Sequence, residues 1–170
     1  MEPPRVVAFI NPRSGGQRGE AVAAALRASL GVSDELVMMK PSEGGPRDGI
    51  RRLLERLQTQ LDDEAAAGSS QSSSSGSSNG AGSSAGSSGV PRAIVLACGG
   101  DGTFNWVCSE LFAAAAGESG GGAGVLGLVD VVPLPLGTGN DVGRALGWGG
   151  RQPGRADIAR LFGGDGGSEL

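Results

Sequence analysis

The chain has 170 residues, a formal net charge of −4, no histidine and two cysteines, Cys98 and Cys108. Without histidine, a Ser-His-Asp triad, a Cys-His pair and histidine-based metal sites are excluded, and two cysteines alone form neither a disulfide framework nor a zinc site. The net charge and an aromatic content of 4% argue against nucleic acid as a partner. The N-terminus lacks the layout of a signal peptide, and no apolar run approaches the ~20 residues that span a bilayer. We therefore expect a soluble cytoplasmic protein without a transmembrane segment, peripheral to membranes at most.

The first half of the chain alternates predicted strands and helices. Residues Arg5–Ile10 form a β-branched and aromatic run that ends at an Asn-Pro turn signal, which indicates a buried strand. Residues Glu20–Leu30 have apolar side chains spaced for one helical face, and Asp34–Lys40 is a second candidate strand. A longer helix follows, with Pro46 in its first turn and arginines and glutamates on its outer face. Its apolar face consists of Ile50, Leu53, Leu54, Leu57 and Leu61.

A low-complexity tract interrupts this alternation at Gly68–Gly89, where 18 of the 22 residues are Ser or Gly. Such a tract buries too little apolar surface to offset the entropy of ordering it, so it is predicted to be disordered. Without the tract, the preceding helix and the following strand are joined by a few residues, the usual length in a βαβ unit. The tract is therefore interpreted as an insert within one domain.

The chain resumes with a strand at Arg92–Cys98 that is apolar on both faces, as in the middle of a parallel sheet. A helix is predicted over Thr103–Ala116, and a flexible loop over Gly117–Gly124. The residues expected on the packed side of this helix are Phe104, Val107, Leu111 and Phe112.

The last predicted strand is Asp130–Leu136, whose prolines favour an edge position in the sheet. A short helix is predicted from about Asp141, and another over Arg155–Phe162. Strands that alternate with helices in this way indicate an α/β fold with a parallel sheet and right-handed crossovers.

Each predicted strand is followed directly by a glycine-rich or small polar loop. The four loops are residues 11–16, 42–45, 99–103 and 137–141. The carboxyl ends of parallel strands meet at one edge of the sheet, where open α/β proteins bind ligands. Glycine allows backbone N–H groups to approach an anion closely, and each loop opens a helix whose N-terminus favours negative charge. Any single loop could be an ordinary strand-to-helix turn, but the four together predict a nucleotide-type phosphate site.

The spacing within these loops argues against the two commonest nucleotide motifs. No G-x-x-x-x-G-K-[ST] sequence occurs, and the only lysine, Lys40, does not follow glycines, so the chain is not a P-loop protein. Gly137, Gly139 and Gly143 miss the dinucleotide-binding spacing by one residue. A different nucleotide chemistry is therefore expected.

Two carboxylates occur in the predicted phosphate loops. Asp101 lies among three glycines after the third strand, and Asp141 ends the fourth loop. Paired carboxylates beside a phosphate site suit Mg²⁺, which would bridge them to nucleotide oxygens. Asp101 could instead accept the proton of an attacking hydroxyl, and either residue could simply cap a helix.

Four stretches resemble the catalytic domain of eukaryotic diacylglycerol kinases. They are residues 7–16, Gly44-Gly-Pro-Arg47, residues 96–103 with Trp106, and residues 133–141 continuing to Trp148-Gly-Gly150. The G-G-D-G-T sequence alone also occurs in bacterial lipid kinases, with close variants in sphingosine kinases and NAD kinases, and Asn105 is closer to the bacterial form. The combination covers about residues 5–162 apart from the insert.

This resemblance implies a three-layer α/β nucleotide-binding lobe of the diacylglycerol kinase and NAD kinase-like group. It also implies a lipid-signalling enzyme that converts ATP and diacylglycerol to ADP and phosphatidate with Mg²⁺. A sphingoid-base or NAD kinase-type phosphotransferase and a non-catalytic nucleotide-binding fragment are the alternatives.

The same resemblance implies site residues in all four loops. The expected ATP-binding residues are Asn11, Pro12, Ser14, Gly15, Gly16, Ser42, Gly99, Gly100, Asp101, Gly102, Thr103, Gly137, Thr138, Gly139, Asn140 and Asp141. Asp101 would be catalytic, and Asp101 and Asp141 would bind the metal. Arg13, Arg18 and Arg144 lie near these loops and could contact phosphates, whereas Trp106 and Trp148 are interpreted as packing residues.

The family's catalytic unit also has a second, mostly β lobe that carries much of the lipid pocket. The 170 residues leave no room for such a lobe. We therefore expect this chain to be the ATP-binding half of the unit, which reaches diacylglycerol at a membrane surface through the missing lobe and has little activity alone.

Overall fold

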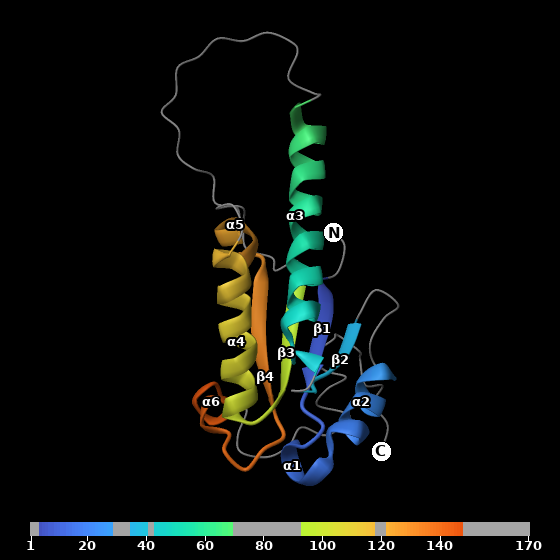
Figure 1. Ribbon diagram of the computed structural model, residues 1–170, viewed down its shortest axis with the longest axis vertical. Helices are drawn as coiled ribbons and strands as arrows, with labels where there is room; N and C mark the ends of the chain where they lie inside the picture. The colour runs from blue at the N-terminus through green and yellow to red at the C-terminus, as the bar shows by residue number, and fades with distance from the viewer. Residues whose placement is uncertain (1–3, 29–34, 41–42, 70–92, 118–121, 148–170) are drawn as a thin grey trace, which may run out of the picture.

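The computed structural model describes residues 4–28, 35–40, 43–69, 93–117 and 122–147. Their elements in chain order are β1 (Arg5–Ile10), α1 (Ser14–Gln17), α2 (Gly19–Arg27), β2 (Glu35–Met38), α3 (Arg47–Ser69), β3 (Ala93–Gly99), α4 (Asp101–Ala116), α5 (Gly122–Leu126), β4 (Val129–Pro135) and α6 (Asp141–Ala145) (Figure 1). Each of the four predicted strands is present, with bounds within one or two residues of those expected. The runs of β-branched and apolar residues were therefore sufficient to locate the sheet.

The four strands form one parallel sheet with the order β2-β1-β3-β4, which confirms the predicted α/β class. In its register, Val7 of β1 lies opposite Val95 of β3, and Val95 lies opposite Val131 of β4. β3 is thus central, as its apolar sequence predicts. β4 is an edge strand of the described sheet, a position that suits Pro133 and Pro135 because proline has no N–H to donate to a neighbour.

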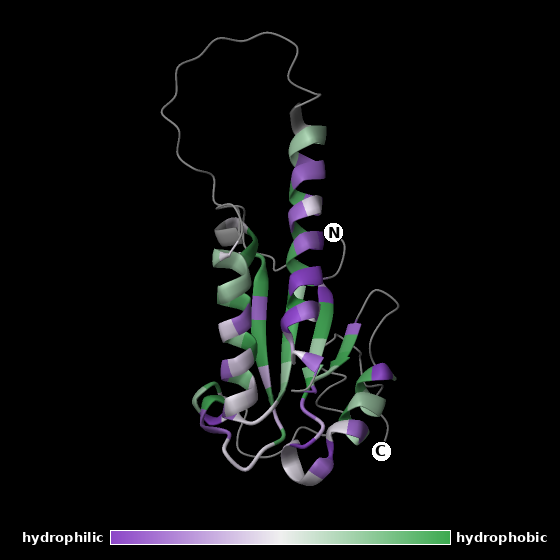
Figure 2. Ribbon diagram, viewed as in Figure 1, coloured by the Kyte–Doolittle hydropathy of each residue, from purple (hydrophilic) through white to green (hydrophobic). Residues whose placement is uncertain are grey.

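The side chains of β1 alternate between two hydrophobic cores on opposite faces of the sheet. Val7 and Phe9 join the core formed with α3, α4 and α5, whereas Ile10 joins the core formed with α2 around Leu26. Both faces of the inner strands are therefore covered by helices, which explains why these strands are nearly continuous apolar runs (Figure 2). The result is a three-layer arrangement with the sheet in the middle.

The helix α3 is 23 residues long and extends beyond the sheet, at the end of the molecule opposite α1 and α6 (Figure 1). Ile50, Leu53 and Leu57 are buried against the sheet, as predicted. Gly68 and Ser69, which the sequence assigns to the insert, are instead the last residues of α3, because the helix continues through the alanines that precede them. The rest of the predicted insert lies outside the described residues.

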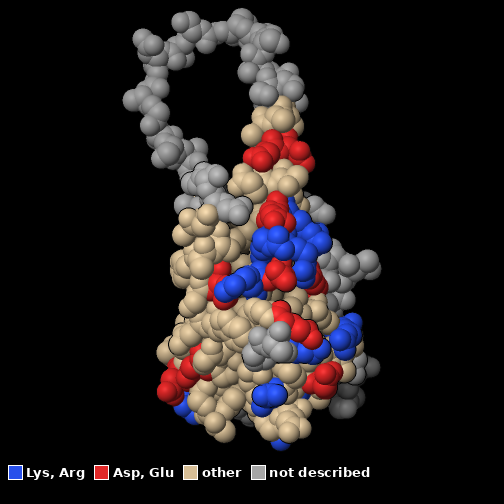
Figure 3. Space-filling model, in the orientation of Figure 1, with Lys and Arg blue, Asp and Glu red and all other residues tan. Residues whose placement is uncertain are grey.

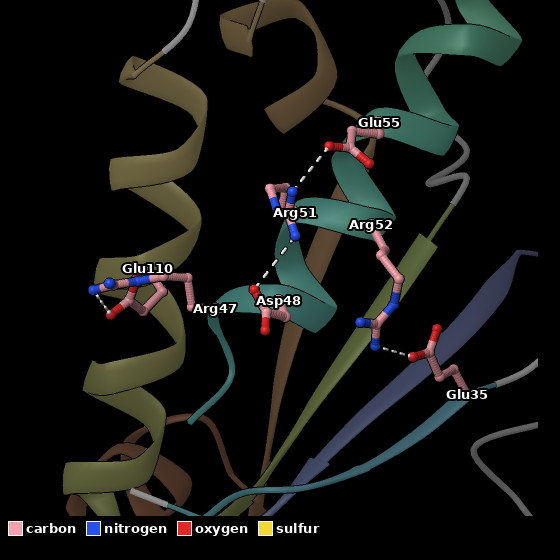
Figure 4. Close-up of polar contacts among 7 residues, drawn as sticks. All are labelled: Glu35, Arg47, Asp48, Arg51, Arg52, Glu55 and Glu110. Carbon is pink, nitrogen blue, oxygen red and sulfur yellow. Dashed lines mark hydrogen bonds and ion pairs between the residues drawn. The ribbon is translucent and has the colours of Figure 1, made fainter. Parts of the chain in front are cut away.

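Charged side chains of both signs cover the outer face of α3 (Figure 3). Arg52 contacts Glu35 of β2 at 2.6 Å, and Arg51 pairs with Asp48 and Glu55 along the helix (Figure 4). Each arginine drawn there faces a carboxylate, so this surface is a set of ion pairs and not a basic patch.

Two details of the sequence interpretation were wrong. Phe112 was expected on the packed side of α4 but is 66% exposed. Thr103, Val107, Leu111 and Ala115 form the buried stripe at a spacing of four residues, and Phe112 lies about 100° around the helix from Leu111. The expected loop over 117–124 instead contains the start of α5, which is anchored by the buried Val125.

Other predictions fall partly beyond the described residues. The helix predicted over Glu20–Leu30 is described as α2, Gly19–Arg27, and Leu30 itself lies outside the described residues. The helix predicted over Arg155–Phe162 and the Trp148-Gly-Gly150 stretch are outside them too.

Candidate functional site

A cleft of about 830 Å³ opens at the carboxyl ends of the parallel strands, where the sequence predicts a phosphate site. Three of the four predicted loops line it, namely those that follow β1, β3 and β4. Its lining residues are Asn11, Arg13, Ser14, Gly15, Gly16, Arg18, Gly100, Asp101, Gly102, Thr103, Trp106, Leu136, Gly137, Thr138 and Gly139. The structure therefore brings most of the predicted ATP-binding residues around one cavity.

Five of the predicted residues are not among those that line the cleft. Ser42 lies outside the described residues. Pro12 and Gly99 belong to the first and third loops but do not face the cavity. Asn140 and Asp141 follow the lining residues of the fourth loop and lead into α6. Among the described residues, the cleft is thus lined by fewer of the motif residues than the sequence predicts.

The first loop contains a left-handed turn. Gly15, Gly16 and Gln17 have φ values of +60°, +69° and +69°, and the turn is closed by a hydrogen bond in which the Arg18 N–H donates to the Ser14 carbonyl at 3.3 Å. A Cβ atom on Gly15 would lie only 2.0 Å from the carbonyl oxygen of Leu136, which follows β4. Glycine at position 15 therefore allows the first loop to pass the end of β3 and touch the fourth loop.

The third and fourth loops are joined directly through their backbones. The Leu136 N–H donates to the Gly99 carbonyl at 2.8 Å, and the Asp101 N–H donates to the Gly139 carbonyl at 3.0 Å. A Cβ atom on Gly137 would lie 2.9 Å from the Cα of Gly100. Because side chains at these positions would separate the two loops, the glycines are needed for the floor of the cleft to form.

Asn11 and Thr103 connect the first and third loops. Asn11 Nδ2 donates to Thr103 Oγ1 at 3.1 Å, and Asn11 Oδ1 accepts the Arg13 N–H at 3.0 Å. Thr103 is only 5% exposed, and its side chain occupies space that a Cβ atom on Gly99 would fill at 2.2 Å. These two polar side chains therefore fix the geometry of the cleft as well as lining it.

Asp101 opens α4, but its carboxylate is directed to a different helix. Its Oδ2 accepts the Asp141 N–H at 2.9 Å, and its Oδ1 accepts the Val142 N–H at 3.1 Å. Both donors are at the start of α6, so Asp101 satisfies the backbone N–H groups that begin that helix. Since it also lines the cleft, Asp101 has a structural role together with any role toward a ligand.

Asp101 and Asp141 do not present their carboxylates to each other in this conformation. The Asp141 carboxylate accepts a hydrogen bond from Arg144 Nη1 at 2.6 Å and lies outside the cleft lining. No group of three or more metal-ligating side chains occurs within the described residues. A single carboxylate still fits Mg²⁺, because this ion is usually held by one or two carboxylates together with phosphate oxygens and water.

Asn140 adds a buried oxygen atom next to these residues. The residue is 3% exposed, and its Nδ2 donates to the Gly137 carbonyl. Its Oδ1 is buried and accepts no hydrogen bond in the described part of the chain. Unpaired buried acceptors are uncommon because their desolvation is costly. The predicted binding role of Asn140 stays a prediction, because the residue is buried and does not line the cleft.

The structure also places two arginines and a tryptophan at the cleft. Arg13 and Arg18 line the cleft, where their positive charges suit an anionic ligand. Trp106, interpreted from the sequence as a packing residue, packs against the core and also lines the cleft. Its position three residues after the G-D-G-T turn, on the first turns of α4, was the one signal in the sequence for this second role.

Comparison with known proteins identifies the class of protein that this fold and cleft define. The family model named "Diacylglycerol kinase catalytic domain" matches residues 5–165. The chain therefore belongs to the diacylglycerol kinase catalytic domain family, which confirms the resemblance carried by the four motif stretches.

Relatives of the chain include much longer proteins. The chain is 31% identical over 145 residues to "Eye-specific diacylglycerol kinase" of Drosophila melanogaster, a match that covers 85% of the chain and 7% of that protein. It is 28% identical over 148 residues to "Diacylglycerol kinase zeta" of Rattus norvegicus, covering 85% of the chain and 11% of the relative. For "Diacylglycerol kinase theta" of Homo sapiens, the identity is 28% over 161 residues, and the match covers 92% of the chain and 12% of the relative. The chain thus spans about a tenth of the length of these relatives.

No solved structure matches the chain. Among the described residues, no helix has both the length and the apolar character needed to cross a membrane.

Proposed function

We propose that this chain is the ATP-binding part of a diacylglycerol kinase, which transfers the γ-phosphoryl group of ATP to the hydroxyl of diacylglycerol and forms phosphatidate and ADP in lipid signalling. The observation that carries the proposal is the cleft at the carboxyl ends of the strands, built from three glycine-rich loops in a chain of this family. Relatives named as diacylglycerol kinases support the choice of lipid substrate.

The polyphosphate of ATP suits the part of the cleft formed by the first loop. Gly16 leaves the backbone open to close approach, because a Cβ atom there would meet nothing within 4 Å, and Arg13 and Arg18 supply two positive charges. Backbone N–H groups and guanidinium groups are the donors that phosphate oxygens prefer. In this proposal the arginines orient the phosphates and offset the charge that develops on them.

Asp101 is the carboxylate that faces the proposed nucleotide. When Mg²⁺ is bound, it neutralises charge on the phosphate oxygens during phosphoryl transfer. Asp101 could hold this ion, with Asp141 as a second ligand once its carboxylate leaves Arg144. Alternatively, Asp101 accepts the proton that the lipid hydroxyl loses as its oxygen bonds to phosphorus.

The acceptor in this proposal is a diacylglycerol at a membrane surface. Its hydroxyl must reach the γ-phosphate through the open side of the cleft, and contacts to its acyl chains would come from outside this lobe. The open side of the cleft would therefore face the membrane surface.

Isothermal titration of ATP into the purified chain, with and without Mg²⁺, tests the nucleotide site. We expect binding that Mg²⁺ strengthens. Because Asp101 also holds the start of α6, Asp101→Asn is a better variant than Asp101→Ala, since it keeps one oxygen acceptor for the α6 N–H groups. Circular dichroism establishes that each variant is folded. A folded wild-type chain that binds no ATP would refute the proposal.

The same titrations separate the two roles of Asp101. If Asp101→Asn abolishes the effect of Mg²⁺ on ATP binding, the carboxylate is a metal ligand. If Mg²⁺ strengthens ATP binding to Asp101→Asn as much as to the wild type, the carboxylate is not a metal ligand, which favours the role of proton acceptor. Asp130→Asn is the matched control, because it removes an exposed carboxylate of β4 that does not line the cleft.

A further inference from the structure

The cleft is lined almost entirely by glycines and polar or charged residues, with few apolar side chains. Apart from Trp106 and Leu136, its residues are glycines, small polar residues, two arginines and Asp101. A nucleotide has two different ends, a polyphosphate and a planar aromatic base. The glycines and arginines suit the polyphosphate, but they offer no flat apolar surface to a base. Trp106 is the one aromatic side chain among the lining residues.

The Trp106 indole makes two contacts, one through its Nε1–H and one through its six-membered ring. Its Nε1–H donates to Glu110 Oε1 at 3.4 Å, one turn further along α4. Its six-membered ring lies against Gly45, where an added Cβ atom would be 2.1 Å from Cζ2 and 2.3 Å from Cη2. The ring therefore connects α4 to the loop that follows β2, and it fits there because residue 45 has no side chain.

Glu110 is itself held by an ion pair to Arg47 of the neighbouring helix α3 (Figure 4). Arg47, the first residue of α3, donates from Nε to Glu110 Oε2 at 3.1 Å and from Nη2 to Oε1 at 3.2 Å. The Glu110 side chain is only 17% exposed. Two parallel hydrogen bonds hold both partners in one orientation, so the acceptor that Trp106 uses does not rotate freely.

From these contacts we infer that Trp106 is the base-binding residue of the nucleotide site, with its ring stacked on the purine, and that Arg47, Glu110 and Gly45 position that ring. The inference rests on the proposed function, because it names the part of the same cleft that receives the base. It also gives the loop after β2 a role, since this loop acts on the cleft through the indole.

Tryptophan fluorescence gives a direct test, because the chain has two tryptophans. Trp148→Phe leaves Trp106 as the single emitter, and Trp106→Phe serves as the matched control. We expect ATP to quench the emission of the Trp148→Phe variant, whereas inorganic triphosphate, which has no base, binds without quenching. Trp106→Leu should weaken ATP binding about 10- to 100-fold, the range expected for one stacked base, and leave triphosphate binding within about twofold.

The outcomes distinguish the inference from the proposed function. If the folded chain binds neither ATP nor triphosphate, both are refuted. If ATP binds but Trp106→Leu weakens ATP and triphosphate equally, or ATP leaves the Trp106 emission unchanged, the nucleotide site stands and the base-stacking inference is refuted. Quenching by vesicles that contain diacylglycerol, with none by ATP, would assign the ring to the lipid and would also overturn the inference.

Two neighbouring glycines test the positioning role. Gly44 and Gly45 have φ values of +82° and +65°, so alanine is strained at both. An added Cβ at Gly45 collides with the indole, whereas at Gly44 it meets nothing within 4 Å. We expect Gly45→Ala, but not Gly44→Ala, to shift the Trp106 emission and to weaken ATP binding more than triphosphate binding. Equal effects of the two variants would refute the positioning role.

Discussion

The contact between Gly15 and Leu136 predicts a large difference between two adjacent substitutions. Gly15 and Gly16 have similar positive φ values, so alanine at either position incurs a similar left-handed backbone penalty of about 1–2 kcal/mol. Only at Gly15 would the new Cβ meet another group, the Leu136 carbonyl oxygen at 2.0 Å. Since this atom belongs to the backbone, a side-chain rotation cannot relieve the overlap, and the loops must separate. Overpacking of this kind typically adds about 1–3 kcal/mol.

We therefore expect Gly16→Ala to lower the free energy of unfolding by about 1–2 kcal/mol, and Gly15→Ala to lower it by about 2–5 kcal/mol. Urea denaturation followed by circular dichroism measures both values. ATP titration should show the same order, because separation of the first and fourth loops widens the phosphate end of the cleft. Equal destabilisation by the two variants would mean that the first loop does not touch Leu136, and would refute the description of how the cleft closes.

Three further predictions concern α4. Asp101→Ala should lower the free energy of unfolding by about 1–2 kcal/mol because α6 loses both acceptors, and Asp101→Asn by less; equal losses in urea denaturation would contradict the capping role. Leu111→Ala should cost about 2–5 kcal/mol and the exposed Phe112→Ala about 0.5 kcal/mol or less, in the same assay. The hydrogen bond from Arg47 lowers the pKa of Glu110. Its carboxylate therefore stabilises the fold above its ordinary pKa and loses that effect as the pH falls below it. The stability difference between wild type and Glu110→Gln should accordingly be present at about pH 6 and shrink as the pH falls below the ordinary pKa of glutamate, and a pH-independent difference would oppose this assignment.

The sheet was the part of the fold most accessible from the sequence. Arg5–Ile10 and Ala93–Gly99 are buried on both faces, so their apolar runs are long enough to be recognised without knowledge of their neighbours. The packed side of α4 was less accessible, because Leu111 and Phe112 are equally apolar and only tertiary contacts decide which of them faces the core. Local pattern therefore located this helix but did not fully orient it.

In the candidate site, too, some features could be predicted from the sequence and others depend on tertiary contacts. The glycine-rich loops could be placed at one edge of the sheet because a parallel topology requires it. The contacts between those loops could not be predicted. Nothing in the sequence indicates that the Asp101 carboxylate reaches α6, about 40 residues away, or that Gly45 leaves space for Trp106. These depend on how separate segments approach one another in three dimensions.

The projection of α3 has a practical consequence for this protein. α3 ends at Ser69 and β3 begins at Ala93, both at the pole opposite the cleft, which lies near α1 and α6 (Figure 1). Because both flanking ends lie away from the cleft, deletion of Gly68–Gly89 should leave the proposed ATP affinity unchanged. The same place is suited to a fluorophore, a purification tag or a tethering peptide, because the ends of α3 and β3 that flank it lie away from the cleft.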